Sequence, residues 1–332
     1  MARHAVTGAT GFLGRHVVHA LRTRGHEVVA LARNVKADLP ADVIVRRADV
    51  TDKASLLDAF AGCEGVFHCA GKVSRKPEDA EELHRIHVIG TKNVLEASQL
   101  ANVRRVVVAS TSGTVAVSDD PDHVGVETDE TPIGLLSRWP YYRAKLFAER
   151  AALEANGPKL EVVCVNPTLL LGPGDVNGSS TEDVRLFLER KIPFVPPGGL
   201  SFVDARDAAE GMILAMERGI PGKRYLLGAC NLTVRELFAR LERTSGVKGP
   251  AIPMPRFPAL SRAGAELVDR ALAKFGASLP VDPVSVEMAQ YFWYLDSALA
   301  ERELGWTARD PIQTLRDTIE DLRARGVVWP KG

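Results

Sequence analysis

The sequence predicts an α/β fold, in which a doubly wound parallel sheet is joined to a smaller, mostly helical C-terminal domain. In the first half of the 332 residues, short apolar runs typical of strands alternate with helical stretches, as in a parallel sheet covered by helices on both faces. After Pro167 this alternation stops, and loops rich in glycine and proline separate shorter elements. We therefore expect one domain over residues 1–170, to which 201–228 return, and a second over 171–200 and 229–332.

The elements follow one another regularly along the first domain. Apolar runs predict strands at residues 5–7, 28–32, 43–47, 66–70, 105–110 and 162–166. Helices are predicted after the first strand, ending at Gly25, and at 83–100 and 142–155. Beyond Pro167 the pattern predicts strands at 201–203 and 225–227 and helices at 207–218, 234–244, 260–275, 283–296 and 312–325.

Three evenly spaced glycines follow the first strand, in the string Val6-Thr7-Gly8-Ala9-Thr10-Gly11-Phe12-Leu13-Gly14. Glycine suits such a turn because the backbone adopts unusual angles and because a Cβ would keep phosphates away. The helix that follows offers unpaired N–H groups and a positive dipole end to an anion. The sheet is therefore predicted to be Rossmann-type, and the candidate ligands of a dinucleotide pyrophosphate are Gly8, Thr10, Gly11, Phe12, Leu13 and Gly14.

The residues after the second and third strands bear on which dinucleotide is bound. About 20 residues past the glycines, where a carboxylate would hold both ribose hydroxyls of NAD, the chain has Arg33-Asn34. An arginine can bind a 2′-phosphate that a carboxylate would repel, which favours NADP. A solvated surface role for Arg33 leaves NAD open. Asp49-Val50 would lie by the adenine edge, or Asp49 would cap the helix that begins near Lys53.

Ligands of an open parallel sheet bind beyond the carboxyl ends of its strands. Three short segments directly follow the fourth, fifth and sixth predicted strands: Cys69-Ala70-Gly71, Ser110-Thr111-Ser112 and Pro167-Thr168. We expect the first and third segments, Cys69, Ala70, Gly71, Pro167 and Thr168, to contact the cofactor.

Tyr141 and Lys145 are separated by one helical turn, so their side chains lie on the same face of a predicted helix. A close ammonium in a poorly hydrated cleft could lower the pKa of a tyrosine from about 10 toward about 7. The pair is therefore a candidate general acid and base. Tyr142 competes for this role, but Leu146 stands at the same offset from it.

Together, the glycine turn, the Ser110-Thr111-Ser112 segment and the tyrosine–lysine pair make the chain resemble the extended short-chain dehydrogenase/reductase superfamily. Within it, the chain is most similar to dihydroflavonol-4-reductase-like, 3β-hydroxysteroid-dehydrogenase-like and hopanoid-associated proteins. The likeness covers nearly the whole length and includes Thr91-Lys92-Asn93-Val94-Leu95-Glu96-Ala97, Asn166-Pro167-Thr168, Phe202-Val203-Asp204 and Glu303-Leu304-Gly305-Trp306.

The resemblance implies chemistry at a carbonyl beside a nicotinamide ring. It makes Tyr141 the proton donor to a ketone oxygen, or the base in the reverse oxidation. Lys145 would lower the pKa of Tyr141 and bind the nicotinamide ribose. Ser112 would donate a hydrogen bond to the substrate oxygen, with Thr111 as the second choice, while Ser110 belongs to the strand end.

Two positions bear on how the chain departs from its relatives. His87 stands where the family usually has asparagine, so the hydrogen bonds of that asparagine must be replaced or lost, and His87 could be structural. Sugar-nucleotide dehydratases of the superfamily follow the serine-equivalent threonine with Asp-Glu, whereas here Thr111 precedes Ser112-Gly113. The acid/base pair for eliminating water is therefore not expected at this site.

Composition narrows the partners. The 42 Lys and Arg balance the 42 Asp and Glu, which argues against nucleic acid, and no apolar run is long enough to span a membrane. The histidine pairs His16/His19 and His84/His87 lack an obvious third ligand, so no metal is expected. The cysteines form no C-x-x-C pair and read as buried free thiols in a reducing cytoplasm; they are Cys63, Cys69, Cys164 and Cys230.

Three functions compete at this point. The first is an NADP- or NAD-dependent reductase of a ketone, or dehydrogenase of a secondary alcohol, that acts on a cyclic, fairly apolar small molecule. Trp293 or Tyr294 would line its pocket. The second is a nucleotide-sugar epimerase with bound NAD, and the third a non-catalytic nucleotide sensor; the protein would be a monomer or homodimer. Diphosphate anchors for the epimerase would be Arg185, Arg190, Lys191 and Arg224.

Overall fold

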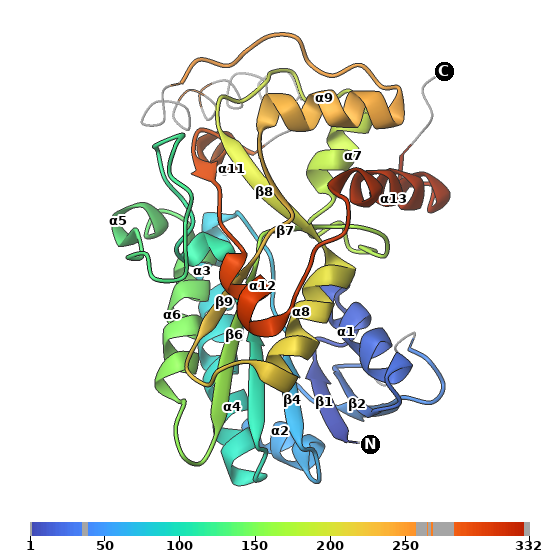
Figure 1. Cartoon of the computed structure of the whole chain (residues 1–332), viewed down its shortest axis with the longest axis vertical. Coiled ribbons are helices and arrows are strands. Elements are labelled where there is room, and N and C mark those ends of the chain that lie inside the picture. The colour runs from blue at the N-terminus through green and yellow to red at the C-terminus, as the bar shows by residue number, and fades with distance from the viewer. Residues whose placement is uncertain (1, 35–38, 257–263, 265–266, 268–281, 329–332) are drawn as a thin grey trace.

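A computed structural model describes residues 2–34, 39–256, 264, 267 and 282–328. Its main sheet has seven parallel strands in the order β3-β2-β1-β4-β5-β6-β9 (Figure 1). The strand order reverses between β1 and β4, which is where such a sheet binds ligands. The predicted fold class is confirmed. The strands are β1 (Arg3–Thr7), β2 (Glu27–Ala32), β3 (Ile44–Arg47), β4 (Gly65–His68), β5 (Arg105–Ala109), β6 (Glu161–Pro167) and β9 (Arg224–Leu227).

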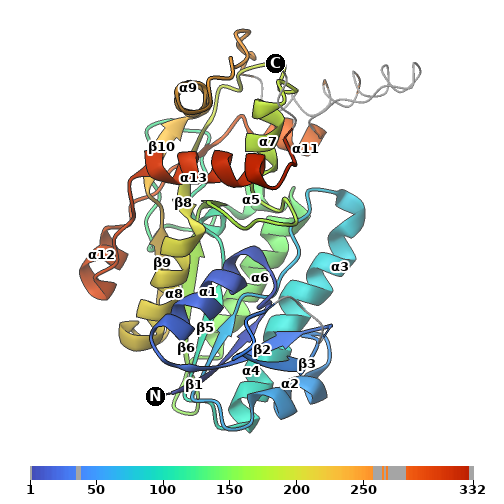
Figure 2. The ribbon, with the colours of Figure 1, turned by 90° about the vertical axis from the view of Figure 1, so that its right-hand side faces the viewer.

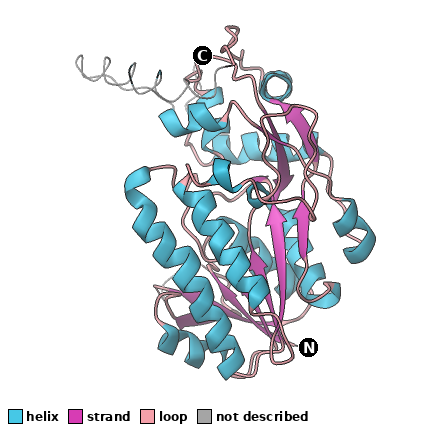
Figure 3. Ribbon diagram, turned by 90° about the vertical axis from the view of Figure 1, so that its left-hand side faces the viewer, coloured by secondary structure: helices cyan, strands magenta, loops and turns pink. Residues whose placement is uncertain are grey.

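Helices cover both faces of this sheet (Figures 2 and 3). Successive side chains of a strand point to opposite faces, so Val6 packs in one apolar cluster and its neighbour Ala5 in another. The first cluster includes α1 (Phe12–Thr23), α8 (Ala205–Arg218) and α12 (Ala298–Leu304), and the second includes α2 (Lys53–Phe60), α4 (Gly90–Leu100) and α6 (Pro140–Glu154).

The helix predicted at 83–100 is longer and interrupted. A 3-10 turn, η1 (Pro77–Asp79), leads into α3 (Ala80–His84), and one π turn, η2 (Arg85–Ile89), separates α3 from α4. Single π turns inside helices occur frequently at functional positions. This one carries His87, which it places on the side of the helix facing the predicted site.

A second, four-stranded sheet lies beyond the carboxyl ends of the first (Figure 1). β8 (Gly199–Asp204) pairs in parallel with β7 (Leu169–Leu171) and β11 (Phe292–Trp293) and antiparallel with β10 (Cys230–Thr233). The helices α5 (Ile133–Leu136), α7 (Glu182–Leu188), α9 (Val234–Ser245), α11 (Pro283–Met288) and α13 (Pro311–Ala324) complete this part. β8 belongs to this sheet, whereas α8 and β9 pack with the first sheet. The predicted domain boundaries remain a prediction.

The sequence pattern was wrong over 283–296. The helix ends at Met288, and Phe292-Trp293 join β8 as a strand, because aromatic residues fit a half-buried sheet surface well and β8 offers a free edge there. The pattern did not predict the short elements β7, β10, α7 and α12, which are too short for a clear period. The helix predicted at 260–275 falls almost wholly outside the described residues.

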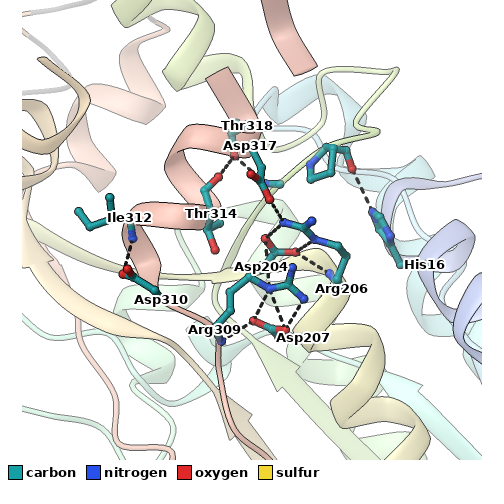
Figure 4. Close-up of polar contacts among 12 residues, drawn as sticks. His16, Asp204, Arg206, Asp207, Arg309, Asp310, Ile312, Thr314, Asp317 and Thr318 are labelled. Carbon is teal, nitrogen blue, oxygen red and sulfur yellow. Dashed lines mark hydrogen bonds and ion pairs between the residues drawn. The ribbon is translucent and has the colours of Figure 1, made fainter. Parts of the chain in front are cut away.

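Buried charges tie α8 to the C-terminal segment (Figure 4). Asp204 is fully buried and caps α8 by accepting from the backbone N–H of Arg206. The Arg206 guanidinium bridges Asp204 and Asp317 of α13. Arg309 pairs with Asp207 at 2.7 Å. Because each buried charge has a partner, the network helps to hold α13 where it packs, against β7 and β8 of the second sheet.

Candidate active site

One cavity of about 450 Å³ lies at the carboxyl ends of the main strands and extends into the C-terminal part. Ser112, Tyr141 and Lys145 all line it. The structure therefore brings these three together with most of the predicted cofactor contacts, which are Gly11, Phe12, Leu13, Gly14, Cys69, Ala70, Gly71, Pro167 and Thr168.

The glycine turn leaves no room for side chains. Gly8 has φ +66°, and a Cβ there would lie 2.6 Å from the Ala70 backbone nitrogen. A Cβ on Gly14 would lie 2.1 Å from the Gly8 carbonyl oxygen. Gly11 is the N-cap of α1 and has no side chain to cap the helix, so the first amides of the helix remain available to an anion. The turn fits a dinucleotide pyrophosphate.

The remaining predicted cofactor residues lie outside the cavity lining: Gly8, Thr10, Arg33, Asn34, Asp49 and Val50. Arg33 is exposed at the end of β2 and acts electrostatically on Asp49. Burial raises the pKa of Asp49, but hydrogen bonds from Thr51 outweigh it, so that the pKa lies below its usual range. Asp52, not Asp49, caps α2, so the capping interpretation of Asp49 was wrong.

Two different segments supply the three predicted catalytic side chains. Ser112 opens the 3-10 turn η3 (Ser112–Thr114) after β5, and Thr111 caps this turn. Tyr141 and Lys145 lie one turn apart on α6, as the spacing predicted. The Lys145 Nζ donates to the Ala109 carbonyl oxygen at 2.6 Å, so the lysine contacts the end of the strand from which Ser112 follows.

The electrostatics differ from the expectation in one respect. Burial lowers the pKa of Lys145 to about 8, partly offset by Glu149. Burial, with the neighbouring Tyr142, raises the pKa of Tyr141 above its usual value, whereas the sequence predicted a lowered one. Lys145 donates to the Ala109 carbonyl oxygen instead, and among the described residues it makes no hydrogen bond to Tyr141 that would lower this pKa.

His87 is part of this site, although the sequence left it as possibly structural. It is buried, lines the cavity and packs edge-on against Tyr141, with ring centroids 5.6 Å apart. Burial lowers the pKa of His87 to about 3, so the ring is neutral, and its Nε2–H donates to the Lys72 carbonyl oxygen at 2.8 Å. His87 thereby links the segment that follows β4 to Tyr141.

The C-terminal part supplies an apolar wall that sequence reasoning mostly missed. Of the two predicted candidates, Trp293 lines the cavity and Tyr294 does not. Trp293 packs against Tyr142 and Trp139. The amphipathic period of α9 could have marked a buried face, but not that this face borders a cavity. Other apolar lining residues are Val184, Ile192, Leu200, Val234, Leu237, Phe238, Leu241, Val284 and Met288.

The predicted diphosphate anchors are not at this wall. Arg185 pairs with Glu182 and Glu189, and Lys191 also pairs with Glu189. Arg224 pairs with Glu149. None of these cations, nor Arg190, lines the cavity. Besides Lys145, the described cations that line the cavity are Lys72, which pairs with Asp79 and Glu82, and Arg75, which pairs with Asp183 and donates to the Ser285 hydroxyl.

Within the described ranges, no three His, Cys, Asp or Glu side chains gather as a metal site. In the same part of the chain, no helix is long and apolar enough to cross a membrane. Cys63, Cys69, Cys164 and Cys230 are free thiols, of which Cys63 and Cys164 are buried.

The family model described as "NAD dependent epimerase/dehydratase family" matches residues 4–228. The chain belongs to this family. It is 33% identical to a putative dihydroflavonol 4-reductase of Synechocystis sp., covering 97% of this chain and 95% of that one. It is 30% identical to sterol demethylase protein B of Methylococcus capsulatus, covering 97% and 99%.

Solved structures agree with this assignment. The crystal structure of gox2253 matches with a TM-score of 0.83 at 28% identity, covering 99% of this chain and 100% of that one. MoeE5 in complex with UDP-glucuronic acid and NAD matches with a TM-score of 0.73 at 26% identity, covering 97% and 99%. The protein is an NAD(P)-dependent oxidoreductase of the extended short-chain dehydrogenase/reductase branch, so the expectation of a non-catalytic sensor is set aside.

Proposed function

We propose that the enzyme reduces a ketone, or oxidises the corresponding secondary alcohol, on a cyclic, fairly apolar small molecule. The observation that carries this proposal is the cavity itself, in which Ser112, Tyr141 and Lys145 share the lining with an extensive apolar wall. A nucleotide diphosphate would need free cations there, and the lining cations Lys72 and Arg75 are already paired with carboxylates. The Stigmatella aurantiaca relative, 31% identical, is named as a ketoreductase of a farnesyl-bearing dihydroquinoline oxide.

The chain's own groups supply binding, orientation and the proton. Ser112 donates a hydrogen bond to the carbonyl oxygen, which polarises the carbon and fixes its face. Tyr141 transfers its hydroxyl proton to the same oxygen as negative charge develops there. The Lys145 ammonium stabilises the phenolate that remains. The apolar wall excludes water from the reacting centre. A nicotinamide cofactor, when bound, supplies the hydride.

The glycine turn and the segments after β4 and β6 would hold this cofactor. We propose NADP, because Arg33 is exposed at the end of β2 and can meet a 2′-phosphate with a charge-assisted hydrogen bond. The Arg33→Ala variant is expected to bind NADPH about tenfold to a hundredfold more weakly and NADH unchanged. Fluorescence titration of both cofactors measures this. Arg150→Ala, at an exposed position of α6, is the control, and equal weakening for NADH would contradict the assignment.

The reaction rate is expected to fall at alkaline pH. In ketone reduction Lys145 must carry its proton, and its pKa is lowered to about 8. Since a lysine is charged below its pKa, kcat for reduction should be constant below this value and decline as pH rises through it. A pH profile of kcat with NADPH and one good ketone measures this decline. A kcat that is still constant about two pH units above this pKa would contradict a role for the Lys145 charge.

A direct assay tests the proposed function. Purified protein is mixed with NADPH and a panel of cyclic and open-chain ketones, and NADPH fluorescence is followed. Turnover with apolar cyclic ketones is the expected result. In parallel, thermal stabilisation by UDP tests the epimerase alternative. Retention of bound NAD through dialysis, no NADPH oxidation with any ketone, and stabilisation by UDP would together replace the reductase by the epimerase.

A further inference from the structure

A buried carboxylate lies directly beneath the candidate active site. Glu149 follows Lys145 by one turn of α6, and its side chain is 1% exposed. One carboxylate oxygen accepts from the Ser110 hydroxyl, from Thr114 Oγ1 at 3.0 Å and from Asn166 Nδ2 at 2.6 Å. The other oxygen is 2.8 Å from Arg224 Nη1. Burying a charge is costly without partners of this kind, so the fold has committed four groups to this carboxylate.

The donors belong to the segments that build the site. Ser110 and Thr114 flank Ser112, and Asn166 directly precedes Pro167-Thr168. Two of these groups also bind the Thr111 carbonyl oxygen: Asn166 Nδ2 at 3.1 Å and Thr114 Oγ1 at 2.9 Å. Through these hydrogen bonds the carboxylate links the end of β5, the turn that carries Ser112 and the end of β6.

The same carboxylate dominates the charges around Lys145. Among the described residues, the titratable groups that act on Lys145 or border it are His68 at the end of β4, Cys69 directly after it, His87 of η2, Cys164 of β6, and Tyr141 and Glu149 of α6. Burial keeps both histidines neutral and raises the pKa of both thiols. Glu149 is therefore the carboxylate that stabilises the Lys145 ammonium, and Arg224 of β9, which pairs with Glu149, weakens this stabilisation.

We propose that Glu149 and Arg224 form a positioning pair that sets how firmly Lys145 holds its proton and keeps the Ser112 turn in place. The proposal rests on the proposed function only in assigning Lys145 a part in the reaction. Glu149 does not line the cavity and acts through Lys145. Removing Glu149 should lower the pKa of Lys145, and removing Arg224 should raise it. A merely structural role would not produce shifts in opposite directions.

The decisive measurement is the titration of Lys145 itself, without cofactor or substrate. Protein labelled with ¹³C-lysine is titrated by NMR, and Lys145→Met assigns the resonance. In Glu149→Gln the pKa of Lys145 is expected to fall by about one unit, since the supporting charge is lost. In Arg224→Gln it is expected to rise, because Glu149 is no longer opposed. Glu154→Gln, at an exposed position of the same helix, should leave it unchanged.

Opposite shifts in the two variants support the pair. Unmoved titrations, or shifts in the same direction, overturn it, even if both variants lose thermal stability. If Glu149→Gln does not fold, the pKa of Lys145 in Arg224→Gln alone decides. A rise supports the proposal, and an unchanged or lower pKa contradicts it. The alkaline limb of ketone reduction should follow the NMR shifts. If the two variants show opposite NMR shifts but the protein reduces no ketone, the proposed function is contradicted, whereas the proposed Glu149–Arg224 pair is still supported.

Discussion

Replacing Tyr141 by phenylalanine is expected to lower kcat for ketone reduction about 10²- to 10⁴-fold, the usual contribution of a positioned general acid. The ring still packs edge-on against His87, as it does in the wild type, so the cavity keeps its shape. Only the hydroxyl group, and with it the transferable proton, is lost. Steady-state kinetics with NADPH, together with cofactor titration, measures the loss; NADPH affinity should stay within about twofold because the hydroxyl contributes mainly in the transition state.

Tyr142→Phe is the matched control, because Tyr142 lies next in the chain, lines the same cavity and stacks on Trp293. Burial raises the pKa of Tyr142 to about 12, opposed by Arg75, and the residue lacks a lysine one turn onward. Its variant should keep kcat within about threefold. A large loss in Tyr142→Phe with normal rates in Tyr141→Phe would exchange the two assignments.

Replacing Gly14 by alanine is expected to break the cofactor turn. The new methyl group would lie 2.1 Å from the Gly8 carbonyl oxygen, an atom that also accepts the Gly11 N–H at 2.9 Å to close the turn. Relieving the clash must move backbone, at a cost of about 1–3 kcal/mol. We expect NADPH affinity to fall at least about tenfold and the thermal midpoint to drop by a few degrees.

Gly134→Ala separates this effect from the general cost of losing a glycine. Gly134 lies in the short helix α5, and a Cβ there would meet no atom within 4 Å. That variant should bind NADPH normally and be as stable as the wild type, since alanine suits a helix better than glycine. Normal NADPH binding by Gly14→Ala would show that the turn is not the pyrophosphate site.

Features that depend on nearby residues could be predicted well. The strand, glycine turn and helix at residues 3–23 formed as expected because each follows from local backbone preference. The run Tyr291 to Tyr294 was assigned to a helix and became in part a strand, since its pairing partner β8 lies about ninety residues earlier. Local pattern cannot represent a partner so distant.

From the order of the residues alone, a glycine turn of the dinucleotide-binding type could be predicted near residue 8, and Tyr141 and Lys145 could be placed on one helical face, because glycine geometry and helical spacing are properties of short segments. The folded chain was needed to show that Trp293 faces the cavity, that His87 packs on Tyr141 and that Arg224 pairs with Glu149. These contacts join segments far apart in the chain, and burial gives them their electrostatic strength. Neither the spatial proximity of distant segments nor the burial of their side chains can be derived from local sequence patterns.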